Sequence, residues 1–238
     1  MSSSPTAPTS TTASSSTSAS PRAPDGRTVL IACGALAQPA AQIADLRGWP
    51  LDIHPLPPLL HNQPHLIADQ VRTLALELRA RGARVAVGYA DCGTYGALDE
   101  VCAELGLERL PGLHCYDVFG GASRIEEFFS EQPGTYVLTD FLVRSFERSV
   151  VRELGLDRHP ELRDDYFGSY TRVVWLAQEP DDELYALAAE AAARIGLPLT
   201  VVPTGLSGLE GALAGLLDSA ALPNSPQVIS TRSMRTVR

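Results

Sequence analysis

The sequence has 238 residues with a formal net charge of −9, and all 19 of its basic residues are arginine. The acidic balance argues against nucleic acid and anionic membranes as partners, because both attract basic proteins, and no apolar stretch reaches the length of a membrane span. The absence of lysine excludes enzymes that work through a lysine Schiff base, and it excludes the nucleotide-binding P-loop.

The two ends of the chain differ in composition from its centre. Residues 1–26 are mostly Ser, Thr, Ala and Pro, and residues 222–238 are polar without periodicity. Such segments bury too little apolar surface to offset their ordering entropy, so we predict two disordered tails around a single α/β domain over residues 27–221. The first segment also lacks the apolar core of a secretory signal. We therefore expect a cytoplasmic protein whose four cysteines are reduced and available for metal binding or thiol chemistry.

Short apolar runs alternate with helical patterns along the first half of the chain. Asn62 is a candidate N-cap because Pro64 follows it near a first helical turn. In chain order the pattern predicts a strand at 28–32, a helix at 37–46, a strand at 51–53, an extended segment at 55–58, a helix from about 64 to 81, a strand at 85–87, a helix at 95–105 and a short strand-like segment at 108–113.

The second half continues the alternation. It predicts a helix at 123–130, a strand at 135–139, a long helix at 141–154 that Asp140 would cap, a loop with a short helix at 157–170, a strand at 172–177, a helix at 181–195, a strand at 199–202 and a helix at 209–217. Alternation of this kind is typical of a mostly parallel, Rossmann-like α/β sheet with helices on both faces. Two half-sheets that meet near the helix at 141 are the alternative arrangement.

Three cysteines occupy similar places relative to the predicted strands. Cys33 follows the first strand, Cys92 follows the strand at 85–87, and Cys115 follows the segment at 108–113. The carboxyl ends of parallel strands meet at one edge of a sheet, where ligands bind. Three thiolates with one open position suit a catalytic zinc ion or an iron–sulfur cluster. The pattern therefore predicts a metal site at this edge, and the alternative is three small residues packed at tight turns.

Two histidines are candidates for a nitrogen ligand that completes the site. His61 precedes a predicted helix and would act as a nitrogen ligand or as a general acid or base, because its pKa lies near neutrality. His114 is the second candidate ligand. Cys92 is also a candidate nucleophile, since a helix N-terminus lowers the pKa of a thiol.

Glycines near these turns would let backbone amides approach a bound cofactor or anion. The candidates are Gly34, Gly93 and Gly121. The first strand is followed by Cys33-Gly34-Ala35-Leu36 instead of a Gly-x-Gly-x-x-Gly fingerprint. A standard dinucleotide site is therefore not expected.

Several motifs together resemble the domain of unknown function 1638 family. They are Cys33-Gly34-Ala35-Leu36, Leu60-His61-Asn62-x-Pro64, Gly88-Tyr89-x-x-Cys92-Gly93, Cys115 and Pro133-Gly134-Thr135-Tyr136-x-Leu138-Thr139. The resemblance extends over about residues 28 to 212. It implies no established activity. Some members occur beside genes for corrinoid-dependent methyltransferases, which suggests methyl transfer or corrinoid handling, and this chain looks like a branch diverged from those members.

Three functional hypotheses remain open at this stage. The leading one is an α/β protein that binds zinc or an iron–sulfur cluster and carries out methyl or sulfur transfer on a small-molecule substrate. The second is a non-catalytic accessory protein that delivers a metal or corrinoid to a partner enzyme. The third is a thiol enzyme with a single nucleophilic cysteine. The sequence does not name the substrate or the oligomeric state.

Overall fold

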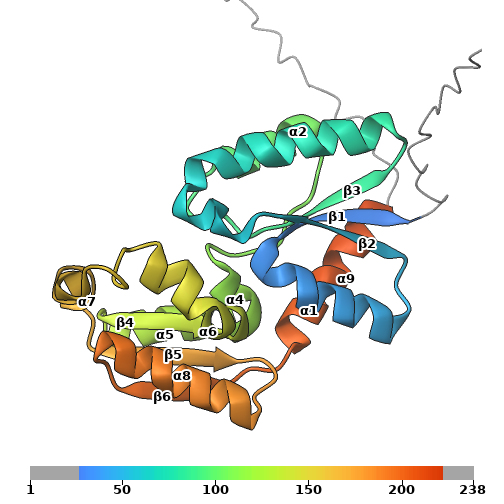
Figure 1. Ribbon diagram of the computed structural model, residues 1–238. Coiled ribbons are helices and arrows are strands. Elements are labelled where there is room, and N and C mark those ends of the chain that lie inside the picture. Colours follow the sequence, from blue (N-terminus) through green and yellow to red (C-terminus); the bar gives the residue numbers. More distant parts are fainter. Residues whose placement is uncertain (1–26, 222–238) are drawn as a thin grey trace, which may run out of the picture.

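The computed structural model describes residues 27–221, which form two lobes, each built on a three-stranded parallel sheet (Figure 1). The first sheet has the order β2-β1-β3, and the second has the order β4-β5-β6. The predicted parallel α/β fold is confirmed, in its form with two half-sheets. The tails predicted at 1–26 and 222–238 lie outside the described residues. The strands are β1 (Thr28–Cys33), β2 (Leu51–Leu56), β3 (Arg84–Gly88), β4 (Thr135–Thr139), β5 (Arg172–Ala177) and β6 (Leu199–Pro203).

In the first lobe, β1 lies in the centre of the sheet. All six residues of β1 are buried because helices cover both faces. Its two neighbours lie on either side, and right-handed crossovers therefore place α1 (Gly34–Arg47) and α2 (Ile67–Ala80) on opposite faces. Two 3-10 turns, Pro58–Asn62 and Pro64–Leu66, lead into α2, and α3 (Ala97–Leu105) packs beside it.

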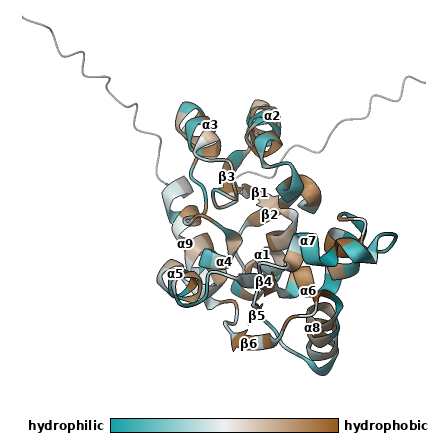
Figure 2. Ribbon diagram, turned by 90° about the vertical axis from the view of Figure 1, so that its left-hand side faces the viewer, coloured by the Kyte–Doolittle hydropathy of each residue, from teal (hydrophilic) through white to brown (hydrophobic). Residues whose placement is uncertain are grey.

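In the second lobe the strands follow one another in chain order. Right-handed crossovers then carry α6 (Asp140–Phe146) and α8 (Asp182–Ile195) to the same face, where they contact each other. The helices α4 (Cys115–Gly120) and α5 (Ala122–Glu131) lie on the opposite side, and Figure 2 shows the second sheet between the two groups. A π-helical turn (Glu147–Arg152) extends α6, and a 3-10 turn (Pro160–Leu162) precedes α7 (Arg163–Phe167).

The last described helix returns to the first lobe. Helix α9 (Ser207–Ala221) contacts α1, β3 and α4, and it buries Leu209, Leu213 and Leu216 in the core of the first lobe. Gly208 allows its close approach to α4, because a Cβ there would lie 2.2 Å from the carbonyl oxygen of Val118. The chain therefore crosses between the lobes twice.

Two predicted elements differ from the structure. The segment at 108–113 forms only an isolated parallel bridge between Val87 and Arg109, since Pro111 and Gly112 interrupt any longer pairing. In the region expected to be extended at 55–58, β2 ends at Leu56 and a 3-10 helix begins at Pro58. Helix α4 was not predicted at all. Among residues 27–221, no helix is both long enough and apolar enough to cross a bilayer.

Two predicted caps are wrong. Asn62 ends a 3-10 turn and is exposed, while the N-cap position of α2 belongs to Leu66. Thr139 takes the capping role expected of Asp140, because its side chain accepts a hydrogen bond from the amide of Leu142. The carboxylate of Asp140 is consequently available for contacts across the end of the second sheet.

Candidate functional site

Cys33 lies where β1 gives way to α1. It is the last residue of the strand and the N-cap of the helix, and its side chain is fully buried. The pKa of the Cys33 thiol is raised to about 12, mainly by burial and to a smaller extent by Cys92. The backbone amides of Ala35 and Leu36 partly oppose this shift. The thiol is therefore protonated at neutral pH.

His61 is the side chain that the structure brings to Cys33. The sulfur of Cys33 lies 3.8 Å from Nε2 and 3.9 Å from Nδ1 of the imidazole. Nδ1 also lies 3.2 Å from the carbonyl oxygen of Pro58, and the ring stacks on Tyr89 with centroids 6.1 Å apart. Burial lowers the pKa of His61, although the Pro58 carbonyl partly offsets this effect. The neutral imidazole that results retains a lone pair for a proton or a metal.

A tight loop carries Cys92 from the end of β3. The carboxylate of Asp91 organises this loop by accepting hydrogen bonds from the Thr94 hydroxyl at 2.7 Å and from the amides of Tyr95 and Gly96. Burial raises the pKa of Asp91, but these hydrogen bonds outweigh it and hold the pKa below its usual value. Cys92 itself has a φ of 52°, in the left-handed region that few side chains adopt.

Cys92 lies in the loop before α3, and its role as a nucleophile stays a prediction. Helix α3 begins only at Ala97, so Cys92 is not at a helix N-terminus as the sequence predicted. Burial raises the pKa of Cys92 to about 11, whereas a nucleophilic thiol requires a lowered pKa.

Cys115 comes to the same edge because its loop runs beside the Cys92 loop. The amide of Cys92 donates to the carbonyl of Leu113 at 2.7 Å, and Cys115 is the first residue of α4. Burial raises the pKa of Cys115 well above its usual value, with further contributions from Cys33 and Cys92. A backbone hydrogen bond thus joins the segment before Cys115 to the Cys92 loop.

His114 and Asp117 have structural contacts around this turn. The carboxylate of Asp117 accepts hydrogen bonds from the amides of Leu113 and His114. The imidazole of His114 is exposed and packs against Tyr116, with ring centroids 5.8 Å apart. Within residues 27–221 it makes no hydrogen bond to a cysteine, and its role as a metal ligand stays a prediction.

The three candidate glycines lie in different surroundings. A Cβ on Gly34 would lie 2.8 Å from the carbonyl oxygen of Leu56, so the link after β2 packs directly on the helix start. Gly93 has a φ of 84° and faces Pro64. Gly121 follows the opposite end of α4 from Cys115. The first two border the cysteines, and the third does not.

Tyr89 has a buried hydroxyl without a partner among residues 27–221. The side chain is fully buried, which raises the pKa of the phenol, and Cys33 and Cys92 add to this shift. Within the same range, no group of three or more His, Cys, Asp or Glu residues is spaced to hold a metal ion. The cysteines and His61 therefore do not form a ready-made coordination sphere in this part of the chain, and the metal site remains a prediction.

Residues 55–213 match the family model described as "Protein of unknown function (DUF1638)". The chain belongs to the DUF1638 family. The resemblance expected from the motifs is confirmed over this range, but the Cys33-Gly34 motif precedes the matched residues. No curated protein and no solved structure matches the chain.

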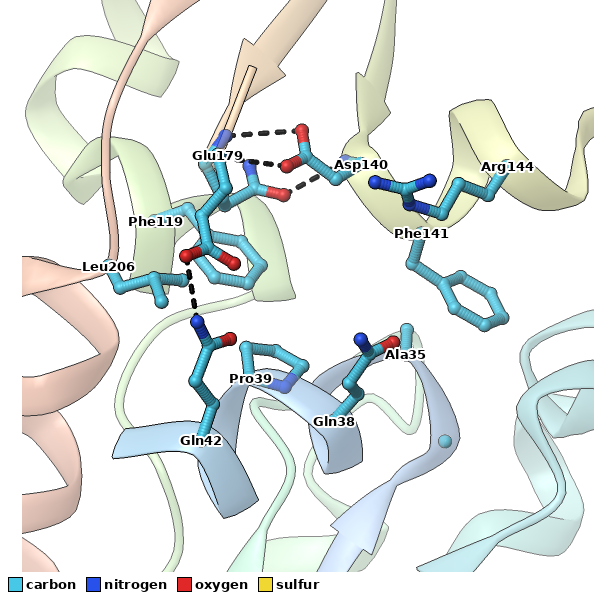
Figure 3. Close-up of a pocket in the computed structure, with 12 residues that line it drawn as sticks. Ala35, Gln38, Pro39, Gln42, Phe119, Asp140, Phe141, Arg144, Glu179 and Leu206 are labelled. Atoms are coloured by element: carbon cyan, nitrogen blue, oxygen red, sulfur yellow. Dashed lines mark hydrogen bonds between the residues drawn. The ribbon is translucent and has the colours of Figure 1, made fainter. Parts of the chain in front are cut away.

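The structure of this DUF1638 member also contains a feature that sequence reasoning missed. A cavity of about 160 Å³ lies between the lobes, where the first turns of α1 face the carboxyl ends of β4 and β5 (Figure 3). A hydrogen bond of 2.7 Å from Gln42 to Glu179 joins its two sides. Glu179 is the second residue after β5, so its position at the end of a parallel strand was the signal that could have indicated it.

Proposed function

We propose that the protein binds a thiophilic metal, as a zinc ion or an iron–sulfur cluster, through Cys33, Cys92 and Cys115, with His61 as the nitrogen donor. The observation that supports this proposal is that Cys33 and Cys92 follow neighbouring parallel strands, with an imidazole 3.8 Å from the Cys33 sulfur. The loop that leads to Cys115 is hydrogen-bonded to the Cys92 loop. Sulfur and imidazole nitrogen are the donors that zinc prefers.

The residues fit such a group in chemistry, because three thiols and an imidazole are the donors of many zinc sites. Rotation about the Cα–Cβ bond of each cysteine changes the distances between the sulfur atoms. The unpaired hydroxyl of Tyr89 also fits, because a thiolate ligand accepts a hydrogen bond and a neutral thiol accepts one only weakly. Metal binding would thus provide the partner that this hydroxyl lacks.

A bound metal would supply a Lewis acid or a stabilised thiolate at the carboxyl edge of the first sheet. We infer methyl or sulfur transfer as the matching reaction class, and we place the chain in a branch diverged from the family members found beside corrinoid methyltransferases. The protein's own residues would bind the metal and exclude water from it, since all three cysteines are buried.

The test is elemental analysis and absorption spectroscopy of full-length protein purified without oxygen. We expect zinc or iron in a fixed ratio to protein, and we expect the ratio to fall in Cys33→Ser, Cys92→Ser and Cys115→Ser. Cys102→Ser is the matched control, because Cys102 is also buried but lies within α3. Equal metal content in all four variants would overturn the proposal, as would well-folded wild-type protein that contains no metal and does not take up zinc.

Proton release provides a second measurement. Burial raises the pKa of Cys33 to about 12 and that of Cys92 to about 11, so both thiols must lose protons when a metal binds. Titration of metal-free protein with zinc in weak buffer should therefore acidify the solution, and the apparent affinity should increase with pH. Rapid alkylation of a single cysteine in metal-free protein, without metal uptake, would support a thiol enzyme instead.

A further inference from the structure

The cavity between the lobes is lined by side chains from both. Apolar groups from three elements form part of its wall, namely Pro39 on α1, Phe119 on α4 and Phe141 on α6. Figure 3 shows Glu179 and Arg144 on different sides of the space, with Gln38 and Gln42 of α1 below them. The volume of about 160 Å³ is close to that of a cavity that accepts a benzene ring. The cavity therefore suits a small organic molecule.

Two polar residues that line the cavity already use their side chains in hydrogen bonds within the protein. The carboxylate of Asp140 accepts hydrogen bonds from the indole of Trp175 and from the amides of Gln178 and Glu179. The side-chain amide of Gln178 accepts from the amide of Asp140 and donates to the carbonyl of Leu176. These residues maintain the end of the second sheet and have little capacity left for a ligand.

Two charged groups of opposite sign retain free capacity. The nearest carboxylate found for Arg144 in residues 27–221 is that of Asp181, at 3.8 Å, which is too far for a hydrogen bond. Glu179 uses one carboxylate oxygen for Gln42, and no donor contacts the other oxygen within the described residues. An anionic ligand would meet repulsion from Glu179, and a cationic ligand would meet repulsion from Arg144. A molecule that carries both charges avoids either penalty.

We propose that this cavity binds a small zwitterion of the α-amino-acid class, with its carboxylate toward Arg144, its ammonium toward Glu179 and its apolar side chain against Phe119 and Phe141. Gln38 and Pro39 of α1 line the same cavity, so the bound ligand lies between the two lobes. The binding does not depend on the metal site proposed above, because none of the four proposed metal ligands lines the cavity.

The experiment is calorimetric titration of the full-length protein with three probes that share the same propyl side chain. L-norvaline carries both charges, pentanoate lacks the ammonium, and butylamine lacks the carboxylate. We expect norvaline to bind at least about tenfold more tightly than either, since each charge-assisted contact is worth about 1.5–3 kcal/mol, and 1.4 kcal/mol is tenfold. Arg144→Gln should cost norvaline a similar factor, and Glu179→Gln should weaken norvaline but strengthen pentanoate.

Arg152→Gln is the matched control, because Arg152 is an exposed arginine on the turn that continues α6. It should bind norvaline as the wild type does. Equal affinities for the three probes would overturn the proposal, and so would unchanged binding in Arg144→Gln. A second measurement covers ligands other than norvaline. If none of the small L-α-amino acids raises the melting temperature of the protein, the proposal is also overturned. Cys33→Ser should retain norvaline binding, which separates this result from failure of the metal site.

Discussion

Replacement of Tyr89 by phenylalanine tests the reasoning about the cysteine site most directly, because the hydroxyl of Tyr89 has no partner among the described residues. A buried hydroxyl without a hydrogen bond costs about 1–3 kcal/mol. Tyr89→Phe removes this cost and keeps the ring that stacks on His61. We therefore expect the free energy of unfolding of metal-free protein to increase by about 1–3 kcal/mol. For a domain of this size, each kcal/mol corresponds to roughly 2–4 °C in melting temperature.

The same substitution should have the opposite effect on metal binding. If the hydroxyl donates to a thiolate ligand, its loss should weaken zinc binding about 10–100-fold, as is typical of groups that support metal ligands. Urea denaturation with a chelator measures the first effect, and competition with a chromophoric chelator measures the second. Tyr166→Phe is the control, because Tyr166 is 44% exposed and should change neither quantity. A loss of stability in metal-free Tyr89→Phe would show that the hydroxyl has a partner, and it would refute this reasoning.

Four further substitutions, one of them a control, test the packing of α1 and the roles of two carboxylates. Gly34→Ala should lower the free energy of unfolding by about 1–3 kcal/mol, because its Cβ would lie 2.8 Å from a backbone oxygen. Gly211→Ala in α9 is the control, because its Cβ meets no atom within 4 Å, and it should increase the free energy of unfolding by up to about 1 kcal/mol. Urea denaturation of the two variants measures both changes. Asp91 has a lowered pKa in the folded state, so its ionised form contributes stability above the unfolded pKa of about 3.9, and this contribution is lost as the pH falls through the folded pKa. Asp91→Asn should therefore reduce the loss of stability that wild-type protein shows between pH 5 and lower values, measured by denaturation across that range. Asp140→Ala should cost about 2–5 kcal/mol, because the buried indole of Trp175 and two backbone amides lose their acceptor; an unfolding curve equal to that of wild type would contradict this.

The strands were predictable from sequence because each is a short apolar run bounded by turn residues. The prediction at 172–177 coincides with β5, and the prediction at 135–139 coincides with β4. The segment at 108–113 pairs with β3 only at the bridge between Val87 and Arg109. Beyond it, the amides of Asp91 and Cys92 donate to the carbonyls of Gly112 and Leu113, so the end of the segment pairs with the loop after β3 and does not lengthen the sheet. The residues of this segment alone do not determine with which backbone groups it pairs.

The positions of the candidate site residues were also predictable only in part. The common edge of Cys33 and Cys92 follows from the parallel pairing of β1 with β3, which the alternation of elements predicts. The exposed position of His114 depends on the turn that Asp117 stabilises, and no local pattern of residues predicts that turn. The cavity between the lobes depends on how the two sheets face each other, which is determined by tertiary packing and has no local signature.

The return of α9 to the first lobe also has a consequence for how the chain is made. The ribosome produces all three strands of the first sheet by residue 88, but the leucines that complete its core lie at 209, 213 and 216. At synthesis rates of about 5–20 residues per second, the N-terminal half waits roughly 6–25 s for them. During that interval the surface that α9 later covers is open to chaperones and to other nascent chains. We therefore expect the second lobe, whose strands are all complete by residue 203, to reach its final packing before the first.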